Sequence, residues 1–179
     1  FFEHKGIDIW GIFRAALKNI RSFEIKQGGS TITQQIIKSL LLTSERKFSR
    51  KIKEAILATR IEQYLSKQDI LTLYLNQIYF GRGAYGIEAA SRVYFGKSAL
   101  HLTLPESAFL AALPKAPSYS RNMDKALERW RYVLGRMQEL GYIKPEEREA
   151  AEKSRLAFIP APTDTSAILN APYFAEHVR

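Results

Sequence analysis

Residues 28–35 read Gly-Gly-Ser-Thr-Ile-Thr-Gln-Gln and mark the start of a helix. The two glycines let the backbone turn without a clash at Cβ and leave N–H groups exposed. Thr31 stands at the N-cap position, and Gln34, three residues later, completes a capping box. An apolar run follows as far as Leu42, so the stretch predicts a helix whose N-terminus attracts anions. An ordinary capped helix without a ligand is the alternative, because caps are far commoner than anion sites.

Helical periodicity continues on both sides of this stretch. Apolar residues at positions 9, 13, 16 and 20 share one stripe, and further helices are expected over residues 49–65, 67–79, 87–94, 103–112, 124–140 and 145–154. Strand signals are weak, and residues 161–179 have the proline-punctuated composition of a linker. We therefore expect one all-α domain over residues 1–160, followed by a linker over residues 161–179.

The composition narrows the classes of partner. The 179 residues are enough for one domain with a core, and the net charge of +9 favours a polyanionic partner. Nucleic acid, an anionic membrane surface and a phosphorylated substrate all satisfy that charge. The absence of cysteine excludes disulfides and thiolate metal sites. No apolar run reaches the roughly 18 residues that a membrane-spanning helix needs.

A second polar stretch, residues 46–54, is densely basic and contains one carboxylate, Glu54. On a helix, Arg50 and Lys51 lie one turn before Glu54 and are its neighbours. These cations suit the oxygens of a diphosphate, and they favour the ionised form of Glu54. Such a carboxylate is better suited to hold a metal, orient a hydroxyl or balance charge than to donate a proton. A solvated face with surface ion pairs is the alternative.

Other chemistry-bearing patterns are weak or missing. Asn76 precedes the glycine-rich turn of residues 81–86, where a structural hydrogen bond explains it as well as catalysis does. No zinc-ligand spacing, phosphate loop, dinucleotide fingerprint or nucleophile elbow occurs in the sequence.

Taken together, these stretches resemble family 51 glycosyltransferases, the lipid II polymerases of class A penicillin-binding proteins and their monofunctional relatives. Residues 1–6 are similar to the end of the first family motif, residues 28–35 match the second in full, and residues 50–54 match the third. Residues 70–81 match the fourth motif, and residues 126–137 resemble the fifth. The resemblance covers roughly residues 1–160.

The resemblance implies a lysozyme-like, two-lobed helical fold with a larger head lobe and a smaller membrane-contacting jaw. It also implies an inverting transfer, in which the 4-hydroxyl of lipid II attacks a lipid-linked glycan chain and undecaprenyl diphosphate leaves. Glu54 is then a catalytic glutamate near the diphosphate. The implied binding residues are Ser30, Thr31, Gln34, Gln35, Lys38, Arg46, Arg50, Lys51 and Asn76. No cofactor is required, although a magnesium or manganese ion near Glu54 is compatible with the family.

One departure concerns the first motif. Its essential glutamate, proposed as the general base in the family, lies four residues before the motif phenylalanine. Phe1 takes the phenylalanine position and His4 the motif histidine, so that glutamate would lie upstream of Phe1. Glu3 fills a variable position and is not expected to inherit the role.

The implied partners are lipid II, the lipid-linked glycan chain, a membrane surface and a moenomycin-type inhibitor at the donor site. Residues 170–179 resemble the connector to a C-terminal transpeptidase domain, and no nucleic-acid motif is present. The implied location is the outer, periplasmic face of the bacterial cytoplasmic membrane, with an anchoring helix upstream of this chain. Residues 9–20 and 40–42 suit an interfacial surface, with burial in the core as the alternative. A lysozyme-like glycan-cleaving enzyme and a non-catalytic basic membrane-binding module are the rival functions.

Overall fold

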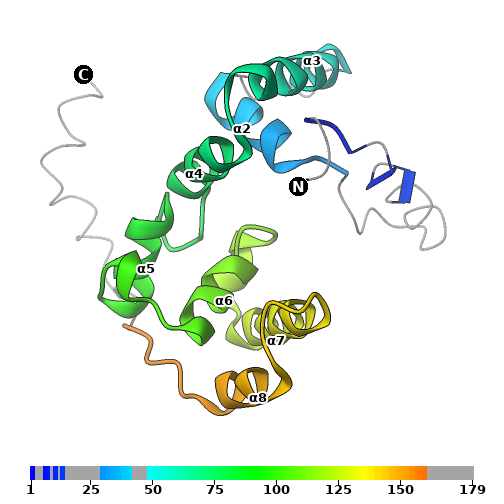
Figure 1. The fold of residues 1–179 in the computed structure, drawn as a ribbon. Helices are drawn as coiled ribbons and strands as arrows, with labels where there is room; N and C mark the ends of the chain where they lie inside the picture. Colours follow the sequence, from blue (N-terminus) through cyan, green and yellow to red (C-terminus); the bar gives the residue numbers. More distant parts are fainter. Residues whose placement is uncertain (3–5, 9, 12, 15–28, 42–47, 161–179) are drawn as a thin grey trace, which may run out of the picture. The chain divides into compact units, whose positions relative to one another are not determined.

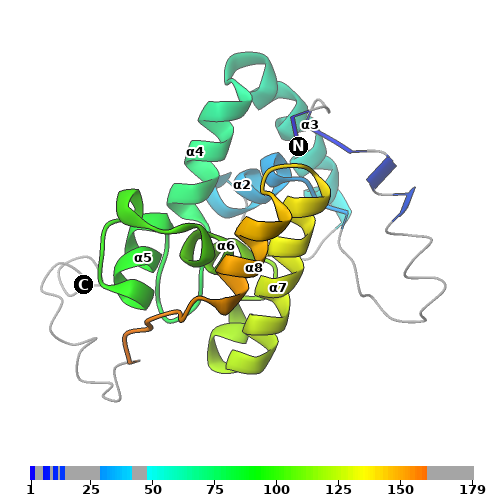
Figure 2. The same ribbon diagram turned by 60° about the horizontal axis from the view of Figure 1, so that its bottom comes forward.

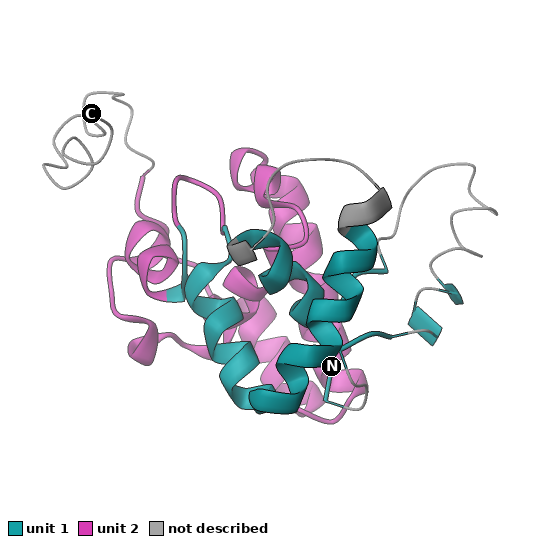
Figure 3. Ribbon diagram, turned by 90° about the horizontal axis from the view of Figure 1, so that it is seen from above, with its two compact units in different colours: residues 1–79, 85–87 teal, residues 80–84, 88–179 magenta. Residues whose placement is uncertain are grey.

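The computed structural model describes residues 1–2, 6–8, 10–11, 13–14, 29–41 and 48–160 and divides the chain into two compact units (Figures 1 and 3). Unit 1 comprises residues 1–79 and 85–87, and unit 2 comprises residues 80–84 and 88–179. Helices dominate the described ranges, which contain no strand beyond an isolated bridge between Tyr79 and Tyr85. The all-α prediction is therefore confirmed. The predicted linker, residues 161–179, lies outside the described residues.

Unit 1 is built on three helices, α2 (Ile32–Leu41), α3 (Phe48–Tyr64) and α4 (Lys67–Gln77). α2 packs against both α3 and α4 and contributes Ile36 and Ile37 to a small apolar core. Its start confirms the predicted capping box: the Gln34 N–H donates to Thr31 Oγ1 at 3.2 Å, and the Thr31 N–H donates to Gln34 Oε1 at 3.0 Å. The residues that the sequence singled out thus fix where α2 begins.

The end of α4 differs from the prediction. The helix stops at Gln77 rather than at residue 79, because Ile78 adopts an extended backbone and Tyr79 pairs with Tyr85. The Gly86 N–H donates to the Ile78 carbonyl at 3.0 Å and closes this turn. The other predicted helices that the structure describes agree with it to within one or two residues.

Unit 2 holds α5 (Ile87–Phe95) apart from its first residue, η1 (Ala99–His101), α6 (Leu104–Ala112), η2 (Pro117–Arg121), α7 (Met123–Glu139) and α8 (Pro145–Lys153). The two short 3₁₀ helices were not predicted. α7 packs against α6 and α8, and α7 and α8 run side by side (Figures 1 and 2). The core is aromatic: Phe109 contacts Tyr94, Phe95 and Phe158, and the Trp130 indole N–H donates to the Pro105 carbonyl at 3.0 Å. Within the described ranges, no helix combines the length and the apolar character needed to cross a membrane.

Candidate active site

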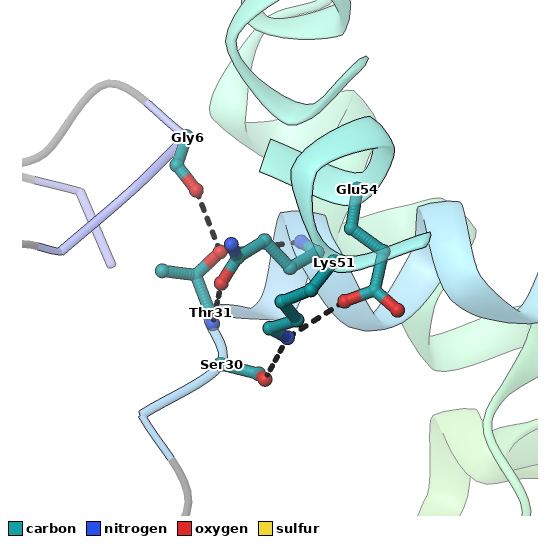
Figure 4. A network of polar contacts seen from close by, with 6 residues as sticks. Gly6, Ser30, Thr31, Lys51 and Glu54 are labelled. Atoms are coloured by element: carbon teal, nitrogen blue, oxygen red, sulfur yellow. Dashed lines mark hydrogen bonds and ion pairs between the residues drawn. The ribbon is translucent and has the colours of Figure 1, made fainter. Parts of the chain in front are cut away.

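Lys51 joins the segments of unit 1 that carry the second and third motifs (Figure 4). Its Nζ donates to Ser30 Oγ at 2.8 Å and to the Glu54 carboxylate at 2.6 Å. Ser30 precedes the cap of α2, whereas Lys51 and Glu54 lie one turn apart on α3. Lys51 and Glu54 were predicted to be neighbours on a helix, and the structure places them in contact. The contact with Ser30, 21 residues away along the chain, brings the second and third motifs together.

The burial of this pair is uneven. The Glu54 side chain is only 2% exposed, whereas that of Lys51 is 53% exposed. A carboxylate taken out of water needs a paired charge, and Lys51 supplies one. An ammonium carries three donors, and Ser30 and Glu54 occupy two of those on Lys51. The cation is therefore held in place from two sides while part of it still faces solvent.

Thr31 fastens the N-terminal segment to α2. Its hydroxyl donates to the Gly6 carbonyl at 2.7 Å (Figure 4). Gly6 has a φ of +78°, and a Cβ at this position would lie 2.6 Å from the Ala58 carbonyl oxygen. Only glycine allows so close an approach of the segment to the backbone of α3. The side chains of Thr31 and Gln34 are buried, and their hydrogen bonds stabilise the local structure.

The remaining predicted site residues are more dispersed. Gln35 is half-buried, and Lys38 is exposed on the following turn of α2. Arg50 lies in the first turn of α3, but only its backbone is described, and Arg46 lies outside the described residues. Asn76 is exposed near the end of α4, with its backbone carbonyl against Gly86, and its side chain has no part in the contacts of Lys51.

One polar cluster of unit 1 was not predicted from the sequence. The Thr33 hydroxyl, which is fully buried, donates to Glu62 Oε1 at 2.6 Å, and Lys67 Nζ lies 2.8 Å from the same oxygen. The Lys67 ammonium also lies 4.5 Å from the centroid of the Phe1 ring. A signal was available, because a hydroxyl on the apolar face of a predicted helix must find a partner. The sequence did not reveal that this partner is Glu62.

The described side chains do not form a protein-held metal site. No three His, Asp or Glu residues in the described ranges are grouped so as to hold an ion. Glu54 faces the ammonium of Lys51 instead. A divalent ion at this carboxylate would need most of its ligands from elsewhere, such as substrate phosphates and water.

Comparison with known proteins identifies the family of this chain. The model of the family described as transglycosylase matches residues 1–138, a range that includes all five motif segments. The chain belongs to the transglycosylase family. The prediction of a glycosyltransferase of the penicillin-binding protein type is thereby confirmed at the level of the family.

The relatives of this transglycosylase are much longer proteins. Penicillin-binding protein 1A of Aquifex aeolicus (strain VF5) is 56% identical over 154 residues, which are 84% of this chain and 21% of that protein. Penicillin-binding protein 1A of Escherichia coli (strain K12) is 48% identical over 183 residues, which are 100% of this chain and 21% of that protein. The chain therefore spans about a fifth of the length of these relatives.

A solved structure supports the fold. The crystal structure of penicillin-binding protein 1A from Haemophilus influenzae superimposes with a TM-score of 0.51 at 32% identity. The match covers 77% of this chain and 18% of that one. The helical, lysozyme-like transglycosylase architecture expected from the motifs is consistent with this similarity.

Proposed function

We propose that this transglycosylase polymerises lipid II into β-1,4 glycan strands and releases undecaprenyl diphosphate, in bacterial cell-wall synthesis. The supporting observation is the Lys51 ammonium, held between Ser30 and the buried carboxylate of Glu54. It supplies a fixed, half-exposed cation beside the N-terminus of α2, and both features favour a phosphate ligand.

The proposed role of this cation follows from where charge develops. When the glycosidic linkage to the lipid breaks, negative charge grows on the leaving diphosphate. A donor that is already in place stabilises that charge without reorganising during the reaction. Lys51 is such a donor, with Ser30 and Gln35 near the start of α2. Lys38, in the last turn of α2, and Arg46 and Arg50 are further candidates. Glu54 holds the ammonium and balances its charge before the substrate binds.

The acceptor half of the reaction needs a base that takes the proton of the attacking 4-hydroxyl. We propose that the glutamate expected upstream of Phe1 fills this role. Glu54 is unsuited to it, because its carboxylate is buried and engaged with Lys51. Asn76 is proposed as a further contact to the sugar chain, on the strength of the fourth motif alone.

A membrane surface is proposed as the route by which the lipid substrate arrives. Trp10 and Phe13 are 79% and 59% exposed, and Arg14 lies beside them. Exposed apolar and basic side chains together suit the interface of an anionic membrane. Replacing Trp10 and Phe13 by serine should lower co-sedimentation with anionic liposomes without unfolding the protein, and unchanged binding would refute this assignment. A periplasmic location, a C-terminal transpeptidase domain and inhibition by a moenomycin-type ligand belong to the same proposal.

The direct test is lipid II polymerisation by the chain extended upstream of Phe1, compared with its Lys51→Ala variant. Loss of one fixed donor should lower kcat by about 10²- to 10³-fold. Arg60→Ala removes an exposed cation from the same helix and should leave the rate unchanged.

Three outcomes would contradict the proposal. A Lys51→Ala variant as active as its parent would remove the cation from the mechanism. Release of short glycans from polymeric peptidoglycan, without polymerisation, would favour the lysozyme-like rival. Salt-sensitive binding to anionic lipids with no turnover would favour a non-catalytic binding module.

A further inference from the structure

The cluster around Glu62 ties together the three helices of unit 1 and the start of the chain. Thr33 belongs to α2, Glu62 to α3 and Lys67 to α4, and all three meet at Glu62 Oε1, at 2.6 Å for the Thr33 hydroxyl and 2.8 Å for Lys67 Nζ. The Glu62 and Lys67 side chains are 7% and 21% exposed. The Phe1 ring lies against the ammonium, 4.5 Å from its centroid to Nζ.

The location of Lys67 is unfavourable for helix stability alone. It is the first residue of α4, directly after the capping residue Ser66. Cations are disfavoured at helix N-termini, where the macrodipole is positive. A buried ion pair is also often no more stabilising than apolar residues of similar size. Helix formation therefore does not explain the charge at this position, whereas its contact with Phe1 offers a reason.

The N-terminal segment is fastened at two points. Phe1 rests on Lys67, and Gly6 bonds to Thr31 and lies against the backbone of Ala58. We infer that Lys67 is a positioning residue, which holds the segment leading into residue 1 in register with the Ser30–Lys51–Glu54 network. This inference rests on the proposed function, because the base is expected a few residues before Phe1. Glu62 and Thr33 act through Lys67 by fixing its ammonium.

The test uses the upstream-extended protein and three variants. Lys67→Met removes the charge and keeps the length of the side chain. The double variant Glu62→Gln/Lys67→Met also neutralises the buried carboxylate and keeps an acceptor for Thr33, so it should recover thermal stability. Lys67→Arg retains both the ion pair and the cation over Phe1. Two quantities are measured: steady-state kinetics on lipid II, and hydrogen exchange at the amides of residues 6 and 7.

A positioning role predicts that kcat falls by about tenfold in Lys67→Met and in the double variant, at unchanged KM. Exchange at residues 6 and 7 should accelerate by about fivefold in both, which corresponds to the loss of one cation–π contact. Lys67→Arg should restore both quantities. Recovery of kcat together with stability in the double variant, or unchanged exchange at residues 6 and 7, would overturn the inference.

The proposed function and the positioning role of Lys67 can be refuted separately. Absence of polymer from the parent protein would refute the polymerase, while the exchange measurement would still decide whether Lys67 holds the segment. Lys51→Ala provides the converse control, since it should abolish most polymerisation and leave exchange at residues 6 and 7 unchanged.

Discussion

The two units of this transglycosylase bury different chemistry. Among its described residues, unit 1 buries Thr31, Thr33, Gln34 and Glu54 beside a small set of apolar side chains. The described part of unit 2 buries the aromatic residues Tyr94, Phe95, Phe109 and Trp130, together with the polar residues Ser91, Glu106 and Ser120. Polar burial has to be compensated by hydrogen bonds, whereas aromatic burial is favourable by itself. We interpret unit 2 as a scaffold that is stabilised by packing. In unit 1, we interpret the buried polar side chains as serving the proposed reaction at some cost in stability.

Two buried glutamates, each paired with a more exposed lysine, show this difference most clearly. Glu106 pairs with Lys97 at 2.7 Å and also accepts the N–H and hydroxyl of Thr103, each at 2.8 Å, as the capping box of α6. Its presence is explained by the start of a helix. Glu54 pairs with Lys51 at 2.6 Å but lies in the interior of α3, where no helix end needs a carboxylate. The first pair serves the fold, and we attribute the second to the reaction.

The largest expected change in stability is in the aromatic core of unit 2. Phe109→Ala should lower the free energy of unfolding by about 3–5 kcal/mol, because it leaves a cavity among the rings of Tyr94, Phe95 and Phe158. Leu100→Ala, at a side chain that is 91% exposed, should change it by less than about 0.5 kcal/mol. Denaturant unfolding checks both values. A loss below about 1 kcal/mol for Phe109→Ala would contradict the interpretation that aromatic packing stabilises unit 2.

The next effect is in unit 1, where backbone lies against backbone. Gly6→Ala places a Cβ 2.6 Å from the Ala58 carbonyl oxygen, so we expect a loss of about 1–3 kcal/mol and displacement of the N-terminal segment. Gly83→Ala is the matched control, because its φ of +75° carries the same strain while a Cβ there meets nothing within 4 Å. Thermal unfolding should place Gly6→Ala well below Gly83→Ala. Equal losses would mean that the approach to α3 does not matter.

The Glu106 pair predicts a dependence of stability on pH. Burial tends to raise the pKa of Glu106, but the bonds from Lys97 and Thr103 outweigh it and bring the pKa below its ordinary value of 4.5. A lowered pKa in the folded state stabilises the protein above the unfolded pKa, and this contribution is lost as the pH falls through the folded value. The Ala99 N–H, with help from Ser98 and Arg92, likewise lowers the pKa of Glu88.

Glu106→Gln tests this directly. It should cost about 1 kcal/mol at neutral pH, since part of the pair is open to screening by water. The difference from the parent should shrink as the pH falls through and below 4.5, the ordinary pKa. Urea unfolding across this range provides the measurement, and a difference independent of pH would contradict the assignment.

The smallest effect is expected for a pair with the same two residue types on the surface. Lys153 and Glu149 lie one turn apart on α8, and both side chains are mostly exposed. Lys153→Ala should change the free energy of unfolding by no more than about 0.5 kcal/mol, with the remainder screened by salt. A larger loss that does not depend on salt would show that an ion pair contributes to the free energy of unfolding whether or not it is buried.

Local features of the fold were predictable from the sequence, and long-range contacts were not. Spacing within a few residues was enough to predict the capping box of Thr31 and Gln34 and the proximity of Lys51 to Glu54. The extent of α3 was predicted in the same way. The 3₁₀ helices η1 and η2 were not predicted, because they are too short to show a periodic pattern of apolar residues. The end of α4 was misplaced because the Tyr79–Tyr85 bridge, a tertiary contact, overrode the helical pattern.

The candidate site divides in the same way. The motifs predicted which residues form the site, but not that Ser30 and Lys51 are in contact or that Thr33 and Lys67 both contact Glu62. These contacts depend on how α2, α3 and α4 pack, and spacing along one helix carries no information about that. The roles of all the predicted site residues, and of the glutamate expected before Phe1, stay predictions.

The most direct test compares Glu54→Gln with Glu106→Gln in the upstream-extended protein, with lipid II as substrate. Both variants remove one buried carboxylate from a lysine, one in each unit. We predict that Glu54→Gln remains folded and loses polymerisation by about 10²-fold or more, whereas Glu106→Gln loses some stability and keeps its rate. Comparable polymerisation by the two variants, or a larger loss in Glu106→Gln, would contradict the assignment of the Ser30–Lys51–Glu54 network to the active site.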